Sequence, residues 1–432
     1  MKQKTKLVAT IMSMCLIVCV AVIGILAAKK LELKVGGNIN FMADGVSFTV
    51  TPGAFYRTDK TTPYANITTQ ENILQGFSMD TNTKLESVQD DIASWDDLEL
   101  VLDSQGDAVL KLNLKNDMTD KDLYVLFAVD PGENLNQNMN IVAPTSEKLA
   151  AGASKDVYIT FDILDHSINA SLEGFEIKLV FSEPVMISDS GEVQNHENLN
   201  YKYIQYDLDS ATNTASICYA DPELSGELLL VDRVYTSTKE YSVTKIDTFV
   251  FSDIETITSV ILPSTLKTIG ASAFTFCTAI KSLVIPDSVT VIEEDAFSDC
   301  FQLEHIVLSK NIKRLELHTF GTAAISSIYI PEGVEFIGTG VFTGCQNLSS
   351  VTLPSTIKQM SDQCFTASNS SDGEYFEYLV VKAPTPPSFV KSESTARPLE
   401  GDFPIYVPAG SVEAYKSAIF WSLIADRIFP IA

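Results

Sequence analysis

The sequence predicts a mainly β protein in three parts: a membrane anchor helix, an antiparallel β-sandwich, and a solenoid of 22–23-residue coils with parallel strands. Three observations carry this prediction: an uncharged run near the N-terminus, short segments with period-2 alternation after it, and a chain that repeats itself from Ile246 onward. The expected parts are the anchor over 1–30, the sandwich over 31–185, a connector over 186–225, the solenoid over 226–370 and its C-terminal cap over 371–432.

The N-terminal segment predicts a membrane anchor. Lys2, Lys4 and Lys6 precede the uncharged run from Leu7 to Ala28. As a helix this run would span about 33 Å, which matches a hydrocarbon core of about 30 Å. A cleaved signal peptide remains the alternative, although Leu26 suits the cleavage site poorly. The positive end is expected in the cytoplasm and residues 31–432 outside the cell, so the protein would be a single-pass cell-membrane protein.

Charge narrows the classes of partner. The chain has 432 residues, with 30 Lys and Arg against 56 Asp and Glu, a formal net charge of −26. Residues 1–30 hold five Lys and no acid, which leaves 25 basic and 56 acidic residues, a net charge of −31, for 31–432. Nucleic acids and anionic lipids need a basic surface, so neither is expected as the main partner of this part.

Residues 31–185 predict a β-sandwich. Apolar and polar residues alternate, as in Leu110, Leu112 and Leu114 against the residues between them, and turn residues separate such segments. Many short strands of this kind indicate two packed antiparallel sheets. The stretch from 110 to 129 and the segment that follows Gly152 resemble immunoglobulin-like sandwich domains near the membrane of Gram-positive surface proteins. Residues 60–96 alternate little and are expected to form a long, partly helical insertion.

The second half of the chain is a repeat. Phe recurs at spacings of 23, 23, 23, 22 and 23 residues, and Cys follows three of these Phe by three positions. The expected repeat core is Phe251, Phe274, Phe297, Phe320, Phe342, Phe365, Cys277, Cys300 and Cys345. A Leu-Pro or Ile-Pro step recurs in the same register, at Leu262-Pro263, Ile285-Pro286, Ile330-Pro331 and Leu353-Pro354.

The properties of one repeat predict that the repeats stack into a solenoid. Each coil offers a short strand that Pro ends, because Pro cannot donate to the ladder. One coil cannot bury its apolar side alone, so coils must stack and the Phe must form an internal column. Cys277 and Cys300 would come within disulfide range, but side chains on adjacent parallel coils seldom reach the needed dihedral, so buried free thiols are favoured.

The repeat resembles the bacterial surface-antigen (BspA-like) class of leucine-rich repeats over residues 226–432. The period, the Leu-Pro step, the Ala273-Phe274 and Ala296-Phe297 pairs and the Cys carry this resemblance. Residues 405–410, with Tyr415 and Trp421 after them, resemble the strand and helix that close such solenoids. The resemblance implies a leucine-rich repeat solenoid displayed on a bacterial surface, with a role in adhesion or protein binding.

No catalytic fingerprint is present. G-x-S-x-G, H-E-x-x-H, P-loop and dinucleotide motifs are all missing, and no C-x-x-C or close His pair suggests zinc. The sequence therefore predicts no enzyme, no cofactor and no metal. What remains is the exposed face of the repeat strands, whose candidate ligand-contacting residues are Ile261, Val284, His305, Val307, Tyr329 and Thr352. The alternative is that short side chains merely suit a stacked sheet.

The expected function is non-catalytic binding of an extracellular protein or glycan, with the membrane engaged through residues 7–28 and no nucleic acid partner. One alternative is a structural envelope protein whose solenoid binds its own cell wall. Another is an enzyme within residues 31–225, which is disfavoured because no convergent carboxylates or metal ligands are seen there.

Overall fold

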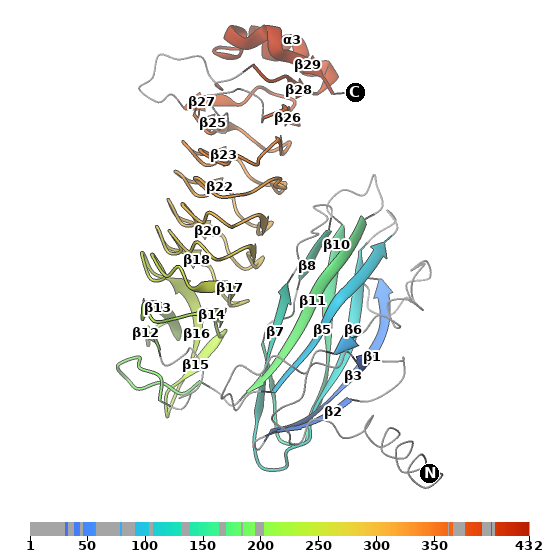
Figure 1. The fold of residues 1–432 in the computed structure, drawn as a ribbon, viewed down its shortest axis with the longest axis vertical. Coiled ribbons are helices and arrows are strands. Elements are labelled where there is room, and N and C mark those ends of the chain that lie inside the picture. Colours follow the sequence, from blue (N-terminus) through green and yellow to red (C-terminus); the bar gives the residue numbers. More distant parts are fainter. Residues whose placement is uncertain are drawn as a thin grey trace, which may run out of the picture. The chain divides into compact units, whose positions relative to one another are not determined.

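The chain forms two compact units, shown in a computed structural model (Figure 1). One unit comprises 1–185 with 196–199, and the other 186–195 with 200–432. Up to residue 102 the structure describes the backbone of strands only. Beyond it, the structure describes 107–130, 139–142, 144, 146–163, 170–182, 185–194, 203–361, 363–365, 376–390, 399 and 402–431. The expected anchor over 7–28 lies outside the described residues, and no helix within them is long and apolar enough to cross a membrane.

The first unit contains two sheets in which every described pairing is antiparallel. One sheet has the order β1 (Leu31–Glu32), β4 (Ser78–Met79), β5 (Asp91–Leu102), β11 (Ala170–Ser182), β7 (Leu123–Asp130) and β9 (Glu147–Leu149). The other has the order β2 (Ile39–Ala43), β3 (Val46–Arg57), β6 (Ala108–Asn116), β10 (Ser154–Ile163) and β8 (Met139–Val142).

Alternation explains why one face of β6 is buried. Leu112 of β6 is paired with Val157 of β10, and Leu110 with Ile159, and all four side chains are buried. The expectation of a long insertion over 60–96 is wrong at its end, because β5 begins at Asp91. The acids in Asp91–Leu102 hide the alternation of a strand that pairs with β4 and β11 on its two sides.

The second unit is a solenoid with two parallel stacks of short strands, which Figure 1 shows as a column of coils. The first stack, here called the strand face, comprises β14 (Gly226–Leu229), β17 (Ile257–Ile261), β19 (Ser282–Val284), β21 (His305–Val307), the Tyr329–Thr352 bridge, β24 (Ser350–Leu353), β26 (Tyr378–Val381), β28 (Ile405–Val407) and β29 (Ile428–Pro430). The second comprises β16 (Glu240–Ile246), β18 (Thr268–Ile269), β20 (Val291–Ile292), β22 (Arg314–Leu315), β23 (Phe336–Ile337), β25 (Gln359–Ser361) and β27 (Ser388–Val390).

The two ends of the solenoid differ from its coils. At the N-terminal end, β12 (Ile204–Asp209) and β13 (Thr214–Ala220) form an antiparallel hairpin, and β13 then pairs in parallel with β16, which also pairs with β15 (Arg233–Tyr235). Part of the expected connector thus continues the second stack. At the other end lie a 3-10 turn over Ala409–Ser411, helix α3 (Val412–Ser417) and a 3-10 segment, η3 (Trp421–Arg427).

Most coils turn a corner after a Pro, and Ser309 takes the place of Pro in one coil. The carbonyl of Pro263 accepts a hydrogen bond from the N–H of Leu266 at 3.0 Å, and that of Pro286 one from the N–H of Val289 at 2.9 Å. The same turn recurs at Pro331 and Pro354. Pro therefore ends the strand and supplies the acceptor for the corner, which is why the Leu-Pro step keeps its register.

A second turn in each coil surrounds the repeat Phe and bonds to the next coil. Its residues two before and two after Phe274, Ser272 and Phe276, have positive φ. The N–H groups of these three residues donate to carbonyls of the following coil at 2.9, 2.9 and 3.1 Å. The turn alternates between left-handed and ordinary backbone because this arrangement points every second N–H along the stack.

Candidate binding faces of the solenoid

The repeat Phe residues form one internal column. Phe251, Phe274, Phe297, Phe320 and Phe342 are fully buried or nearly so, and Phe365 is 3% exposed. Consecutive rings are stacked, with centroids 5.0–6.1 Å apart and planes within 19° of each other. Phe376 and Phe403, which the repeat spacing does not reveal, extend the column. The column holds the coils in register and leaves the outer faces free for other roles.

The repeat Cys residues lie beside this column as free thiols. The thiols of Cys277, Cys300 and Cys345 donate to the carbonyls of Phe251, Phe274 and Phe320 at 3.1, 3.2 and 3.1 Å. Burial raises the pKa of the Cys300 and Cys345 thiols to about 12. These cysteines are small core residues that satisfy a carbonyl, and they are unsuited to nucleophilic chemistry, which requires the thiolate.

A thiol-reactive reagent at pH 8 should therefore discriminate among the cysteines. Cys218 is exposed and should be modified in the native protein, whereas Cys277, Cys300, Cys345 and Cys364 are buried and should be protected until urea unfolds the chain. Peptide mass mapping after a short labelling pulse measures this. Rapid native labelling of Cys300 would contradict this assignment.

The same burial predicts a pH dependence of stability. Because folding raises the thiol pKa above its unfolded value of about 9, the contribution of these thiols to the free energy of unfolding should be full below pH 9 and fall as pH rises towards 12.

The candidate ligand residues lie on successive strands of the strand face. Val284 is paired with Val307, and Tyr329 with Thr352, while Ile261 lies on β17 beside β19. These residues and His305, which is paired with Ser282, are all half-buried. The intervening residues, such as Leu283 and Ile306, point into the core. The structure thus brings the six candidates together along one outer surface.

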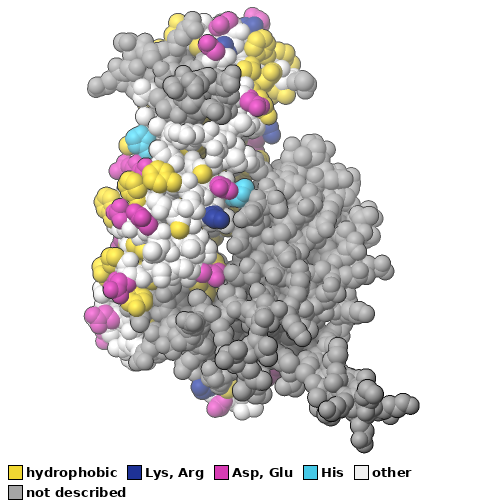
Figure 2. Space-filling view, in the orientation of Figure 1, with side chains coloured by type: hydrophobic (Ala, Val, Ile, Leu, Met, Phe, Trp, Pro, Cys, Tyr) yellow, Lys and Arg dark blue, Asp and Glu magenta, His cyan; other side chains and the backbone are white. Residues whose placement is uncertain are grey.

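The strand face continues beyond the residues that the sequence indicated. Thr352 is paired with Val380, Val380 with Tyr406, and Tyr406 with Phe429. Tyr378 packs edge-to-face on Tyr406 with ring centroids 6.0 Å apart, and the ring centroids of Tyr406 and Phe429 are 6.2 Å apart. Tyr378 is 38% and Phe429 45% exposed. An aromatic cluster thus ends the strand face, and hydrophobic side chains cover β28 and β29 in Figure 2.

The charge of the strand face is low within the repeats. Lys281 and Glu304 are its exposed charged residues there, and the Lys281 carbonyl accepts hydrogen bonds from the N–H groups of Glu304 and His305. Neighbouring outward positions are Ser259, Ser282, Ser327 and Ser350. Among the described residues, no group of three or more His, Cys, Asp and Glu is placed to hold a metal ion. Shape, hydroxyl groups and aromatic rings are what this face offers a ligand.

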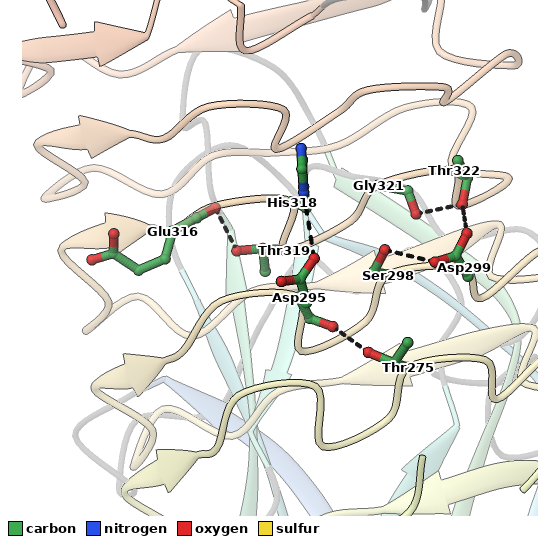
Figure 3. Close-up of polar contacts among 9 residues, drawn as sticks. All are labelled: Thr275, Asp295, Ser298, Asp299, Glu316, His318, Thr319, Gly321 and Thr322. Atoms are coloured by element: carbon green, nitrogen blue, oxygen red, sulfur yellow. Dashed lines mark hydrogen bonds and ion pairs between the residues drawn. The ribbon is translucent and has the colours of Figure 1, made fainter. Parts of the chain in front are cut away.

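The turns around the Phe column form a second outer surface, with a polar network (Figure 3). Nδ1 of His318 lies 3.5 Å from Oδ1 of Asp295, whose carbonyl accepts a hydrogen bond from Oγ1 of Thr275 at 2.7 Å. Oδ1 of Asp299 accepts from Oγ1 of Thr322 at 2.7 Å, and its Oδ2 from Oγ of Ser298 at 3.0 Å. All of these contacts except the one between Ser298 and Asp299 cross from one coil to the next, so they fix the side chains of the turn surface.

The repeat matches a known family. The model of the BspA type leucine rich repeat region matches six copies over residues 244–372. The expectation of a BspA-type leucine-rich repeat solenoid is therefore confirmed for this part of the chain. No curated protein matches the chain.

Several solved structures resemble the chain. A leucine-rich repeat protein from T. pallidum is 26% identical, with 37% of this chain and 73% of that chain covered and a TM-score of 0.34. One from Bacteroides ovatus is 21% identical, with 49% and 70% covered and a TM-score of 0.34. A leucine rich cell surface protein from Faecalibacterium prausnitzii is 16% identical, with 53% and 92% covered and a TM-score of 0.28.

Proposed function

We propose that the protein is a non-catalytic binding or adhesion protein of the cell surface, whose strand face engages an extracellular protein or glycan. The observation that carries the proposal is the row of mostly uncharged residues on successive coils from Ile261 to Phe429, which ends in an exposed aromatic cluster. Solenoids use such extended surfaces for recognition, aromatic residues are enriched at protein interfaces, and Tyr is one of the side chains that most often anchor a partner. The family match of the repeats agrees with a binding role.

The proposed placement on the cell follows from the rest of the chain. The uncharged run over 7–28 would anchor the N-terminus, and residues 31–432 would lie outside. We propose that the two antiparallel sheets of the first unit pack as an immunoglobulin-like sandwich next to the membrane. Contacts between β11 and β8, and between β2 and β5, which belong to different sheets, support this packing.

The test uses cells that display the full chain on their surface. It measures how strongly these cells adhere to arrays of matrix proteins, glycans and purified cell wall. Tyr329→Ala and Tyr406→Ala should each weaken adhesion to the ligand by about tenfold or more, because a buried Tyr anchor contributes about 2 kcal/mol. His305→Ala should weaken it less. Protease treatment of intact cells should abolish adhesion, because the solenoid faces outward.

Tyr219→Ala on β13 is the matched control. Tyr219 is 46% exposed but lies outside the strand face, so its loss should leave adhesion unchanged. If both the Tyr329 and the Tyr406 variants adhere as strongly as wild type, the strand face is not the binding surface. Adhesion that survives protease until the cells are lysed would contradict the surface placement. Binding to purified wall alone would replace adhesion by an envelope role.

A further inference from the structure

Two exposed aromatic rings lie on the turn surface, away from the strand face. Phe276 is 38% and Phe301 51% exposed, and their rings meet edge-to-face with centroids 6.2 Å apart. Both follow a core Phe, Phe276 by two positions and Phe301 by four, and they come from consecutive coils. Neither contributes to the internal column.

The fold does not require an aromatic residue at this turn. Positions equivalent to Phe276 in other coils hold Asp253, Asp299, Thr322 and Gly344, and all have positive φ. Phe276 adopts φ +59°, a region that a bulky side chain enters only at a cost. A small or polar residue would serve the turn better and would spare the protein an exposed ring. The ring therefore needs an explanation other than folding.

Acidic residues occupy the turns on either side of Phe276. The N–H of Asp253 donates to the carbonyl of Thr275 at 2.8 Å, and the N–H of Phe276 to that of Ser298 at 3.1 Å, so Asp253, Phe276 and Asp299 follow one another from coil to coil. Exposed Glu255 lies in the first of these turns. Ser298 and Thr322 hold the Asp299 carboxylate in place (Figure 3).

These three carboxylates have no cationic partner in the described part of the chain. The ion pairs found there involve other acids, such as Asp247, Asp287 and Asp295. Hydrophobic and acidic side chains also lie side by side on the solenoid surface that Figure 2 shows. An aromatic pair with carboxylates nearby that lack a cationic partner is complementary to a group that is both planar and positive.

We propose that Phe276 and Phe301, with Asp253, Glu255 and Asp299 around them, form a docking site for a positively charged, arginine-bearing segment of a partner protein. A guanidinium stacks on an aromatic ring and also forks towards carboxylate oxygens, which an ammonium does less well. The acidic balance of the chain, 56 acids against 30 basic residues, would draw such a segment to it. This site is separate from the strand face and would act independently of it.

Fluorescence anisotropy with the detergent-solubilised full chain tests the site. The probe is a labelled nine-residue peptide that alternates arginine and glycine, and its citrulline counterpart lacks the charge. We expect binding to the arginine peptide that weakens with salt, and none to the citrulline peptide. The double variant Phe276→Ala/Phe301→Ala should bind about tenfold more weakly, and Asp253→Asn also more weakly, because the aromatic faces and a carboxylate are lost.

Two further variants keep the test decisive. Phe249→Ala removes a ring that is more exposed, at 63%, from the other side of the Phe251 turn, and should bind as wild type. Phe276→Gly relieves the positive φ, so its unfolding midpoint should be unchanged or higher while binding falls. Binding of the double variant within twofold of wild type would overturn the proposal. An equal loss in Phe249→Ala would also overturn it, because the attraction would then be general to the acidic surface.

Discussion

Replacing Phe297 by Ala is expected to lower the free energy of unfolding of the solenoid by about 3–5 kcal/mol. Phe297 lies in the middle of the internal column, stacked 5.5 Å from Phe274 and 5.9 Å from Phe320. The truncation removes both ring contacts and leaves a cavity that the backbone cannot close, because coil-to-coil hydrogen bonds fix the spacing. Chemical denaturation followed by circular dichroism measures the loss.

The same substitution should also change cooperativity. A solenoid is stabilised mainly through contacts between neighbouring coils, so a weak interface in the middle should let the two halves unfold at different denaturant concentrations. Phe249→Ala, which truncates an exposed Phe near the N-terminal end, should stay within about 0.5 kcal/mol of wild type. If Phe297→Ala is no less stable than Phe249→Ala, the column is not what holds the coils together.

The repeat was predictable because its period fixes three things at once. The 23-residue spacing places one Phe of each coil in the column, and the Leu-Pro step supplies the corner after the strand. The Cys three positions after Phe donates to the carbonyl of the repeat Phe in the preceding coil. Each of these is a local feature that most coils share, although Ser309 replaces Pro in one coil and Cys follows only three of the Phe. The sequence pattern therefore carries the structure of this region directly.

The continuation of the strand face was not predictable in the same way. After Phe365 the spacing breaks, since Phe376 follows 11 residues later and Phe403 another 27. The register of Val380, Tyr406 and Phe429 is set by strand pairing, which the structure shows and the spacing does not. The resemblance of residues 405–410 to the closing strand of such solenoids was the signal of a further strand.

The turn surface was missed for a different reason. Position averages along the repeat favour Asp, Ser, Thr and Gly two residues from Phe, which suits positive φ. Phe249, Phe276 and His318 depart from that rule, but a departure at one coil looks like noise until the backbone angle and the exposure are known. The aromatic pair with Phe301 joins residues 25 positions apart, so only the stacking of coils reveals it.

The second large effect is expected at the C-terminal cap, where Trp421→Ala should cost about 3–5 kcal/mol. Trp421 is fully buried, and its Nε1–H donates to the carbonyl of Pro387 at 2.8 Å. Its ring lies 4.9 Å from those of Tyr415 and Phe389. Tyr415 belongs to α3, which also contacts β29, so the indole joins the cap to the last coils.

Loss of that joint should affect association as well as stability. β29 is the outer strand of its sheet, and a cap that no longer holds would leave the apolar end of the solenoid open to another copy. Sedimentation velocity should then show concentration-dependent association of Trp421→Ala. Ile419→Ala, which truncates an exposed residue two positions away, should remain as stable and as dispersed as wild type. A Trp421→Ala protein that matches the Ile419→Ala control in both measurements would mean that the cap is held by other contacts, with the Pro387 hydrogen bond contributing little.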